Sequence, residues 1–399
     1  MTHSRSEPGG VTAPRGFRAA GVACGLKANG ALDLALVVGD AACACAGLFT
    51  TNRVRAAPVL YDQQVLARNR DSIRAVVANS GCANACTGEA GLADAQAMAE
   101  AAAQAIGCRA DQVLVLSTGV IGKRLDVGKV RAGLAQAAPR LSRDGGADAA
   151  HAIMTTDTRP KECAVRDARY AIGGMCKGAG MIHPNMATML AVITTDTAIS
   201  PGLLDRALRA AVDRSFNRIS VDGDTSTNDT VLALANGLSG HTVREGTDFE
   251  AFTDALTQTA IELATQIVRD GEGATKFVAI AVSGARNEAD AAQVGKAIAN
   301  SPLVKTALYG GDANWGRVLA AAGYSGVEID PGSMALWFGD VQLVANGAPT
   351  ACDESDAARA IAGRNVLIRL DLGLGHAGAT IWTCDLSHDY VTINADYRT

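Results

Sequence analysis

The segment KGAGMIHPNMATML, residues 177–190, decides how this chain folds and what its chemistry is. Its glycines and the His-Pro-Asn of residues 183–185 predict a constrained turn, which Thr188 follows. The apolar run MLAVITT, residues 189–195, starts one residue later and has the composition of a buried strand. Thr188 therefore stands between a turn and a core strand, where it is either a packing residue or a nucleophile.

The composition indicates a globular protein without a basic surface. The chain has 399 residues and a net charge of −5, so it is long enough for a large α/β body and offers no basic field to nucleic acid. No run approaches the roughly 20 apolar residues of a membrane span, and the N-terminal MTHSRSEPGG lacks the apolar core of a signal peptide. We expect a cytoplasmic protein with neither a nucleic-acid nor a membrane partner.

Strand and helix patterns alternate in both halves of the chain. Apolar runs predict strands over residues 32–38, 73–79, 112–117, 189–195, 276–284, 365–372 and 378–386. Helical periodicity is present over residues 91–106, 203–214, 251–269 and 289–300, and the third of these places one apolar face on Phe252, Leu256, Ala260, Leu263 and Ile267. This mixture predicts an α/β or mixed α+β fold, with polar segments 142–148 and 284–288 as candidate breaks.

No metal or cofactor motif is present in the sequence. The ten cysteines include no CxxC pair and the six histidines are scattered, so we expect free, mostly buried thiols and no metal site. Dinucleotide-binding and P-loop glycine motifs are also absent. We therefore expect a protein without a bound cofactor.

Two polar segments have both a chemical and a structural interpretation. In STGVIG, residues 117–122, the backbone N–H groups, the Thr118 hydroxyl and the permissive Gly119 can hold an oxyanion, although the same residues can simply cap a helix. The acidic segment DGDTSTNDT, residues 222–230, is interpreted as a turn network, because its spacing is not that of a calcium loop.

A threonine nucleophile needs a base to take its proton. An N-terminal threonine can use its own α-amine, whose pKa is about 7.7–8.0. Thr188 gains that amine only if the Ala187–Thr188 bond is cut, which its hydroxyl can do by attacking the Ala187 carbonyl. Gly178, Gly180 and Pro184 are residue types that build the constrained backbone required. Composition alone leaves the choice between nucleophile and strand residue open.

Nine segments, in order, resemble the ornithine acetyltransferase family, and the resemblance runs from residue 16 to the C-terminus. The segments are NSGCANACTG (79–88), STGVIG (117–122), IMTTDT (153–158), KGAGMIHPNMATML (177–190), SFNRISVDGDTSTNDT (215–230), RDGEGATKFV (269–278), SPLVKTA (301–307), GDANWGRVLAA (311–321) and CDLSHDYVTINADYRT (384–399). The resemblance implies two packed α/β units, similar in logic to the N-terminal-nucleophile hydrolases.

The resemblance also implies roles for individual residues. It makes Thr188 the nucleophile and Ala187–Thr188 the self-cleavage site, giving an α chain, 1–187, and a β chain, 188–399, that stay together. It places the oxyanion hole on Thr118 and Gly119. The substrate-binding residues that it implies are Thr155, Lys177, Thr188, Glu272, Asn394 and Thr399.

The implied reaction moves acetyl from N2-acetyl-L-ornithine to L-glutamate through an acetyl-threonine, as a ping-pong step of cyclic arginine biosynthesis. Acetyl-CoA as an additional acetyl donor, and an assembly of two α and two β chains, are further expectations from the family. The alternatives are an N-terminal-threonine aminopeptidase or amidase, a secondary-metabolism relative with another acyl acceptor, and an uncleaved metabolite-binding protein.

Overall fold

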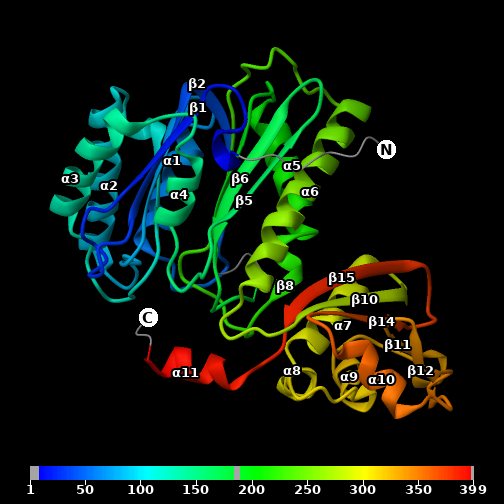
Figure 1. The fold of residues 1–399 in the computed structure, drawn as a ribbon. Helices are drawn as coiled ribbons and strands as arrows, with labels where there is room; N and C mark the ends of the chain where they lie inside the picture. Colours follow the sequence, from blue (N-terminus) through cyan, green and yellow to red (C-terminus); the bar gives the residue numbers. More distant parts are fainter. Residues whose placement is uncertain (1–8, 184–188, 397–399) are drawn as a thin grey trace.

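The computed structural model describes residues 9–183 and 189–396, which form two units, each built on its own sheet (Figure 1). The prediction of a mixed α/β fold with two units is confirmed. Three residues with predicted roles, Ala187, Thr188 and Thr399, lie outside the described residues.

The first unit contains an eight-stranded sheet. Its long strand β2 (Leu34–Phe49) pairs with β1 and β3 through its first half and with β9 through its second half. In spatial order the sheet is β4 (Val113–Ser117), β3 (Ile73–Asn79), β2, β9 (Thr230–Ala235), β7 (Leu190–Thr195), β6 (Ala171–Lys177) and β5 (Lys161–Arg166), with β1 (Phe17–Val22) beside β2.

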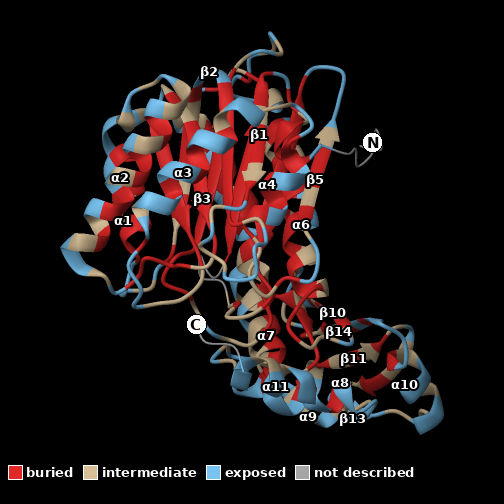
Figure 2. Cartoon of the chain, turned by 60° about the vertical axis from the view of Figure 1, so that its left-hand side comes forward, coloured by how far each residue is buried: buried red, intermediate tan, exposed pale blue. Residues whose placement is uncertain are grey.

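Helices bury both faces of this sheet. On β7, Leu190 and Val192 pack into one core while Ala191 and Ile193 pack into the other, which explains why residues 189–195 are continuously apolar. Figure 2 shows these strands buried beneath helices whose outer faces are exposed. The first core includes α1 (Ala57–Arg68), α2 (Gly88–Ile106), α3 (Val127–Ala137) and α4 (Gly146–Ala152), and the second includes α5 (Pro201–Asp213) and α6 (Thr247–Arg269).

The second unit contains a seven-stranded sheet with its own core. In spatial order its strands are β13 (Ala348–Pro349), β12 (Val341–Ala345), β11 (Ala335–Phe338), β14 (Asn365–Asp371), β10 (Phe277–Ala285), β15 (Ala377–Cys384) and β8 (Ile219–Ser220). Its helices are α7 (Glu288–Ala299), α8 (Pro302–Tyr309), α9 (Trp315–Gly323) and α10 (Glu354–Ile361). The last helix, α11 (His388–Asp396), has no buried residue and extends away from the second sheet, beneath the first unit in Figure 1.

Local sequence signals account for many of these elements. All seven predicted strands and all four predicted helices are present, and the five apolar side chains assigned to one face of α6 are buried. Helix α5 is capped by Ser200, whose side chain accepts the N–H of Leu203, and begins with Pro201 at the first helical position.

Some sequence expectations were incomplete or wrong. Strand β6 was not predicted, because it contains two glycines, which are uncommon in strands. At Gly173 a Cβ would lie 1.9 Å from the carbonyl oxygen of Gly10, so packing of the N-terminal turn requires glycine there. The candidate breaks at 142–148 and 284–288 are wrong, because each joins elements of a single unit.

The described residues contain free thiols at all ten cysteines. Within residues 9–183 and 189–396, no three His, Cys, Asp or Glu side chains converge as a metal site would require. No helix in the same ranges is both long and apolar enough to cross a bilayer.

Candidate active site

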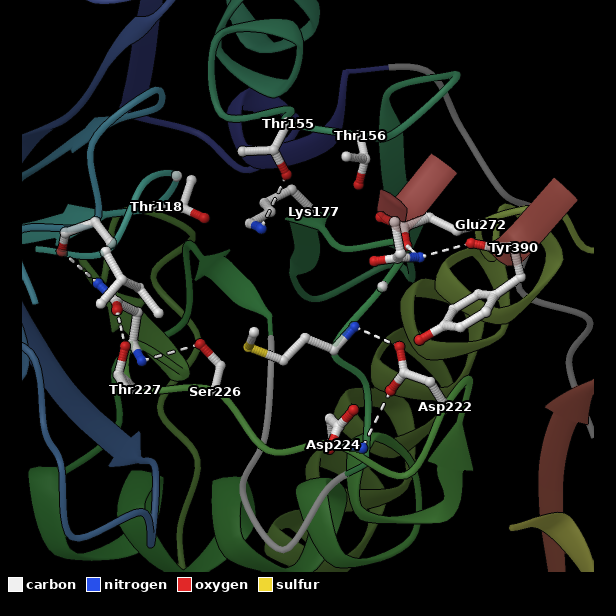
Figure 3. A pocket seen from close by; sticks show the side chains of 17 residues that line it. Thr118, Thr155, Thr156, Lys177, Asp222, Asp224, Ser226, Thr227, Glu272 and Tyr390 are labelled. Carbon is white, nitrogen blue, oxygen red and sulfur yellow. Dashed lines mark hydrogen bonds between the residues drawn. The ribbon is translucent and has the colours of Figure 1, made fainter. Parts of the chain in front are cut away.

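A cavity of about 130 Å³ opens at one end of the first sheet and faces α11 (Figure 3). Its walls come from the segments after β4, α4 and α6, from the end of β6, from the segment before β9, and from α11. The cavity brings together six residues that the sequence singled out: Thr118, Gly119, Thr155, Lys177, Glu272 and Asn394.

The turn after β4 provides hydrogen-bond donors on one wall. The backbone N–H of Thr118 donates to the carbonyl of Asn79 at 3.0 Å, so the hydroxyl, which Figure 3 shows directed into the cavity, is the donor that Thr118 offers to a ligand. Gly119 has a φ of +125°, and a Cβ there would lie 2.5 Å from the carbonyl carbon of Gly81. Both the backbone angle and the close approach require glycine at this position.

The polar segment 222–230 holds this turn and the neighbouring loop in place. The Asn228 amide donates to the carbonyls of Ala83 and Ser117 at 2.7 and 2.8 Å. The Asp222 carboxylate accepts the N–H groups of Met181 and Ile182 at 2.5 and 2.8 Å, which stabilises the φ of +57° at Met181. The segment is a turn network, as predicted, and it supports two walls of the cavity.

Lys177 provides the positive charge of the cavity from the end of β6. Its side chain is buried, and its ammonium donates to the Thr155 hydroxyl at 3.2 Å. Burial lowers the pKa of Lys177, while the negative charges of Asp157, Asp229 and Glu272 act in the opposite direction.

Glu272 lies on another wall, next to the C-terminal helix. Its carboxylate accepts the side-chain amide of Asn394 at 2.8 Å, and its backbone N–H donates to Ala179 at 2.9 Å. A Cβ at Gly180 would lie 2.2 Å from a Glu272 carboxylate oxygen, so the glycine leaves room for this acid. The cavity thus presents a cation, an acid and a group of hydroxyl and amide donors to a small polar molecule.

Comparison with known proteins identifies the family. Residues 18–399 match the ArgJ family. The chain belongs to the ArgJ family. Similar relatives include the arginine biosynthesis bifunctional protein ArgJ of Symbiobacterium thermophilum, at 54% identity over 98% of this chain and 99% of the relative. The mitochondrial ArgJ of Yarrowia lipolytica is 47% identical over 99% of this chain and 96% of the relative.

A solved ArgJ structure is also similar to part of the chain. The crystal structure of ArgJ from Bacillus halodurans is 44% identical, with a TM-score of 0.50, and covers 51% of this chain and 97% of the solved chain. The ArgJ relatives match over nearly their whole length, so the family assignment extends to both units.

Sequence reasoning did not assign several residues that line the cavity of this ArgJ-family chain. Tyr390 lies on α11 one helical turn before Asn394, and its ring reaches towards Asp222 in Figure 3. Thr156 and Ser226 also contribute to the lining. The signal for Tyr390 was available, because residues four apart on a helix share a face, but nothing local indicated that α11 covers a cavity.

Proposed function

We propose that this ArgJ-family chain is a self-processing glutamate N-acetyltransferase of arginine biosynthesis, with Thr188 as its nucleophile. The observation that carries the proposal is that Lys177, Glu272, Thr118 and Gly119 line the same cavity. An N-acetyl amino acid presents a carboxylate, an acyl carbonyl and a nitrogen leaving group, and each has a complementary group in this cavity.

In the first half-reaction, the Thr188 hydroxyl attacks the acetyl carbonyl of N2-acetyl-L-ornithine and gives its proton to the Thr188 α-amine. The negative charge that develops on the carbonyl oxygen is stabilised by the Thr118 hydroxyl and the backbone N–H of Gly119, a type of contact that is worth roughly 2.7–4 kcal/mol per donor. The C–N bond breaks, the amine leaves with the proton, and ornithine departs from an acetyl ester on Thr188.

In the second half-reaction, the α-amine of L-glutamate attacks the ester carbonyl, and the C–O bond to Thr188 breaks. The Thr188 α-amine passes the proton lost by the attacking amine to the Thr188 oxygen, and N-acetyl-L-glutamate leaves. Both amino acids carry an α-carboxylate, so Lys177 and the Thr155 hydroxyl bonded to it serve both substrates. Glu272, held by the Asn394 amide, binds an amino group of the substrate. Thr399 is expected to complete the substrate contacts. One cavity used in turn by two amino acids gives ping-pong kinetics.

The strand register supports Thr188 as the nucleophile. Leu190, two residues after Thr188 in the sequence, pairs directly with Lys177 on the neighbouring strand. The carbonyl of Met189 accepts the N–H of Thr230 at 3.0 Å. The first described residues after Thr188 are therefore anchored beside the cationic wall of the cavity.

The predicted cleavage between Ala187 and Thr188 is also part of the proposal. The solved Bacillus halodurans chain is matched over 97% of its length but covers 51% of this chain, which supports a family enzyme divided into two chains. We expect two α and two β chains in the assembly. Native mass spectrometry tests this expectation, because such an assembly has twice the 40.8 kDa mass of the whole chain.

Acetyl-CoA as a second acetyl donor is supported by the word bifunctional in the names of the curated relatives. An assay with glutamate and acetyl-CoA, free of acetyl-ornithine, tests this second activity. The full-length match to ArgJ proteins does not favour an aminopeptidase or amidase.

The test of the main proposal follows acetyl from donor to product. Purified protein is incubated with N2-acetyl-L-ornithine, with and without L-glutamate. We expect N-acetyl-L-glutamate when glutamate is present, and without it an added mass of about 42 Da, one acetyl group, on the fragment that begins at Thr188. The Thr188→Ala variant is expected to stay uncleaved and inactive, and Thr306→Ala, on the exposed side of α8, to behave as wild type. Release of acetate alone would indicate a hydrolase, and a fully active Thr188→Ala protein would overturn the proposal.

A further inference from the structure

A buried charge cluster lies behind the cavity and is formed by residues without an assigned role. The ammonium of Lys161, on β5, lies 2.5 Å from a carboxylate oxygen of Asp157 and 2.5 Å from one of Asp270. The side chains of Lys161, Asp157 and Asp270 are 1%, 0% and 4% exposed. Charges buried this deeply are costly unless each is paired, so the three residues depend on one another.

The Asp157 carboxylate also accepts hydrogen bonds from two segments that line the cavity. One oxygen accepts the N–H of Thr155 at 2.9 Å, and the other accepts the N–H of Gly178 at 2.7 Å. Thr155 carries the hydroxyl that Lys177 binds, and Gly178 is the residue directly after Lys177. One carboxylate therefore joins the loop after α4 to the end of β6.

We propose that Asp157 is a positioning residue that holds the Thr155 hydroxyl and the Lys177 ammonium together as the carboxylate-binding end of the substrate site. This inference rests on the proposed acetyl transfer, since it assumes that both amino-acid substrates present their α-carboxylate to Lys177. Asp157 does not line the cavity, so it acts through its two backbone contacts and its charge.

The role of Lys161 is to keep this carboxylate ionised. Although burial favours the neutral acid, the positive charges of Lys161 and Lys177 lower the pKa of Asp157 below its ordinary value. The hydrogen bonds from Thr155 and Gly178 then end on a charged acceptor, which makes them stronger than bonds to a neutral one.

The charged groups around Lys177 define the expected pH effect. Asp157, Asp229 and Glu272 favour its ammonium form, whereas burial and the positive charge of Lys161 oppose it. Lys27, from the segment between β1 and β2, carries a further positive charge that interacts with Lys177. Because the negative charge of Asp157 favours the ammonium, its removal lowers the pKa of Lys177 further, and the ammonium is lost at a lower pH.

The experiment compares Asp157→Asn with Asp270→Asn in the full-length enzyme. Each variant removes one of the two carboxylates bound to Lys161, so both are expected to lower the melting temperature. Only Asp157→Asn changes the acceptor of Thr155 and Gly178. For this variant we expect KM for acetyl-ornithine and for glutamate to rise by about tenfold each with a smaller change in kcat, as for lost ground-state binding. When kcat/KM is plotted against pH, the basic limb of Asp157→Asn should move to lower pH. The basic limb of Asp270→Asn should match that of wild type.

Asp157→Glu provides a second variant if the asparagine variant does not fold. It keeps the negative charge and displaces the acceptor oxygens, so we expect a raised KM with the basic limb unmoved. Wild-type enzyme assayed in parallel reports on the proposed function through its N-acetyl-glutamate output. An active wild type, together with equal KM values and equal pH limbs in Asp157→Asn and Asp270→Asn, would overturn the inference and leave the proposed function intact.

Discussion

Single residues determine whether the cavity can accept a reacting group. Gly180 leaves the space that the Glu272 carboxylate occupies, and Gly119 has a backbone angle that other residues rarely adopt. Lys177 and Glu272 are both buried at the cavity, so water screens their charges less than it would at the surface. The chemistry of the cavity therefore depends on a few positions where neither size nor charge can change freely.

Gly119→Ala tests the proposed oxyanion hole. The new Cβ would lie 2.5 Å from the Gly81 carbonyl carbon, so the turn must shift and misplace its donors. We expect kcat for acetyl transfer to fall by about 10²–10³, as for the loss of one oxyanion donor, measured by steady-state kinetics. Gly122→Ala is the matched control, because Gly122 also has a positive φ, of +79°, but has no atom within 4 Å of the added Cβ. Equal kinetics for the two variants would contradict the assignment.

At the scale of elements, helix α1 provides a hydrogen-bond acceptor to the edge strand β4. Strand β4 is at the edge of the first sheet, and the buried Asp62 of α1 accepts the N–H of Val115 on that strand at 2.8 Å. This contact covers an edge that would otherwise be free to pair with another chain. The second oxygen of Asp62 has no partner among the described residues. Burial raises the pKa of Asp62 well above its usual range, although the Val115 hydrogen bond opposes this shift.

Asp62→Asn is expected to stabilise the protein increasingly as the pH rises. The pKa is higher in the folded than in the unfolded state, so the native protein loses stability as the pH rises from the unfolded value, about 4, through the folded value. Asparagine keeps an acceptor for Val115 and does not titrate. We expect the melting temperature of Asp62→Asn to exceed that of wild type by more at pH 8 than at pH 5, with Asp254→Asn, on the exposed side of α6, as the control. A difference that is constant with pH would show that Asp62 does not titrate in this way.

At the scale of the whole molecule, the proposed chains and the structural units do not coincide. Strands β7 and β9 follow the proposed cleavage site, yet they lie between β2 and β6, which precede it. Parting the two chains would break the β2–β9 and β6–β7 ladders and expose both cores. Cleavage is therefore compatible with a fold that stays intact.

We expect the α and β chains to copurify and to separate only when the protein unfolds. Size-exclusion chromatography in increasing urea, with electrophoresis of each fraction, follows the two chains. They should leave the native peak together, at the concentration where circular dichroism reports unfolding. A folded fragment of residues 1–187 eluting alone below that concentration would contradict the interleaved sheet.

Sequence reasoning performed best where a signal is local. The strand at 189–195 and the buried face of α6 follow from apolar periodicity, which reports directly on burial. Strand β6 was missed because the contact that requires Gly173 is with Gly10, far away in the sequence. Not all of the backbone N–H groups of residues 117–122 face a ligand, because the Asn79 carbonyl on the neighbouring strand accepts the N–H of Thr118.

The sequence by itself determined the seven strands and four helices with clear apolar periodicity, the net negative charge and, through its ordered motifs, the family of this protein. Only the tertiary structure decided that Thr118, Thr155, Lys177, Glu272 and Asn394 line one cavity. These residues are spread over nearly 280 positions of the chain, and no local pattern specifies their distances. Strand order and the burial of both sheet faces bring their segments together. The Asp157–Lys161–Asp270 cluster forms because Asp270 meets Lys161 from 109 positions further along the chain, which leaves each buried charge paired.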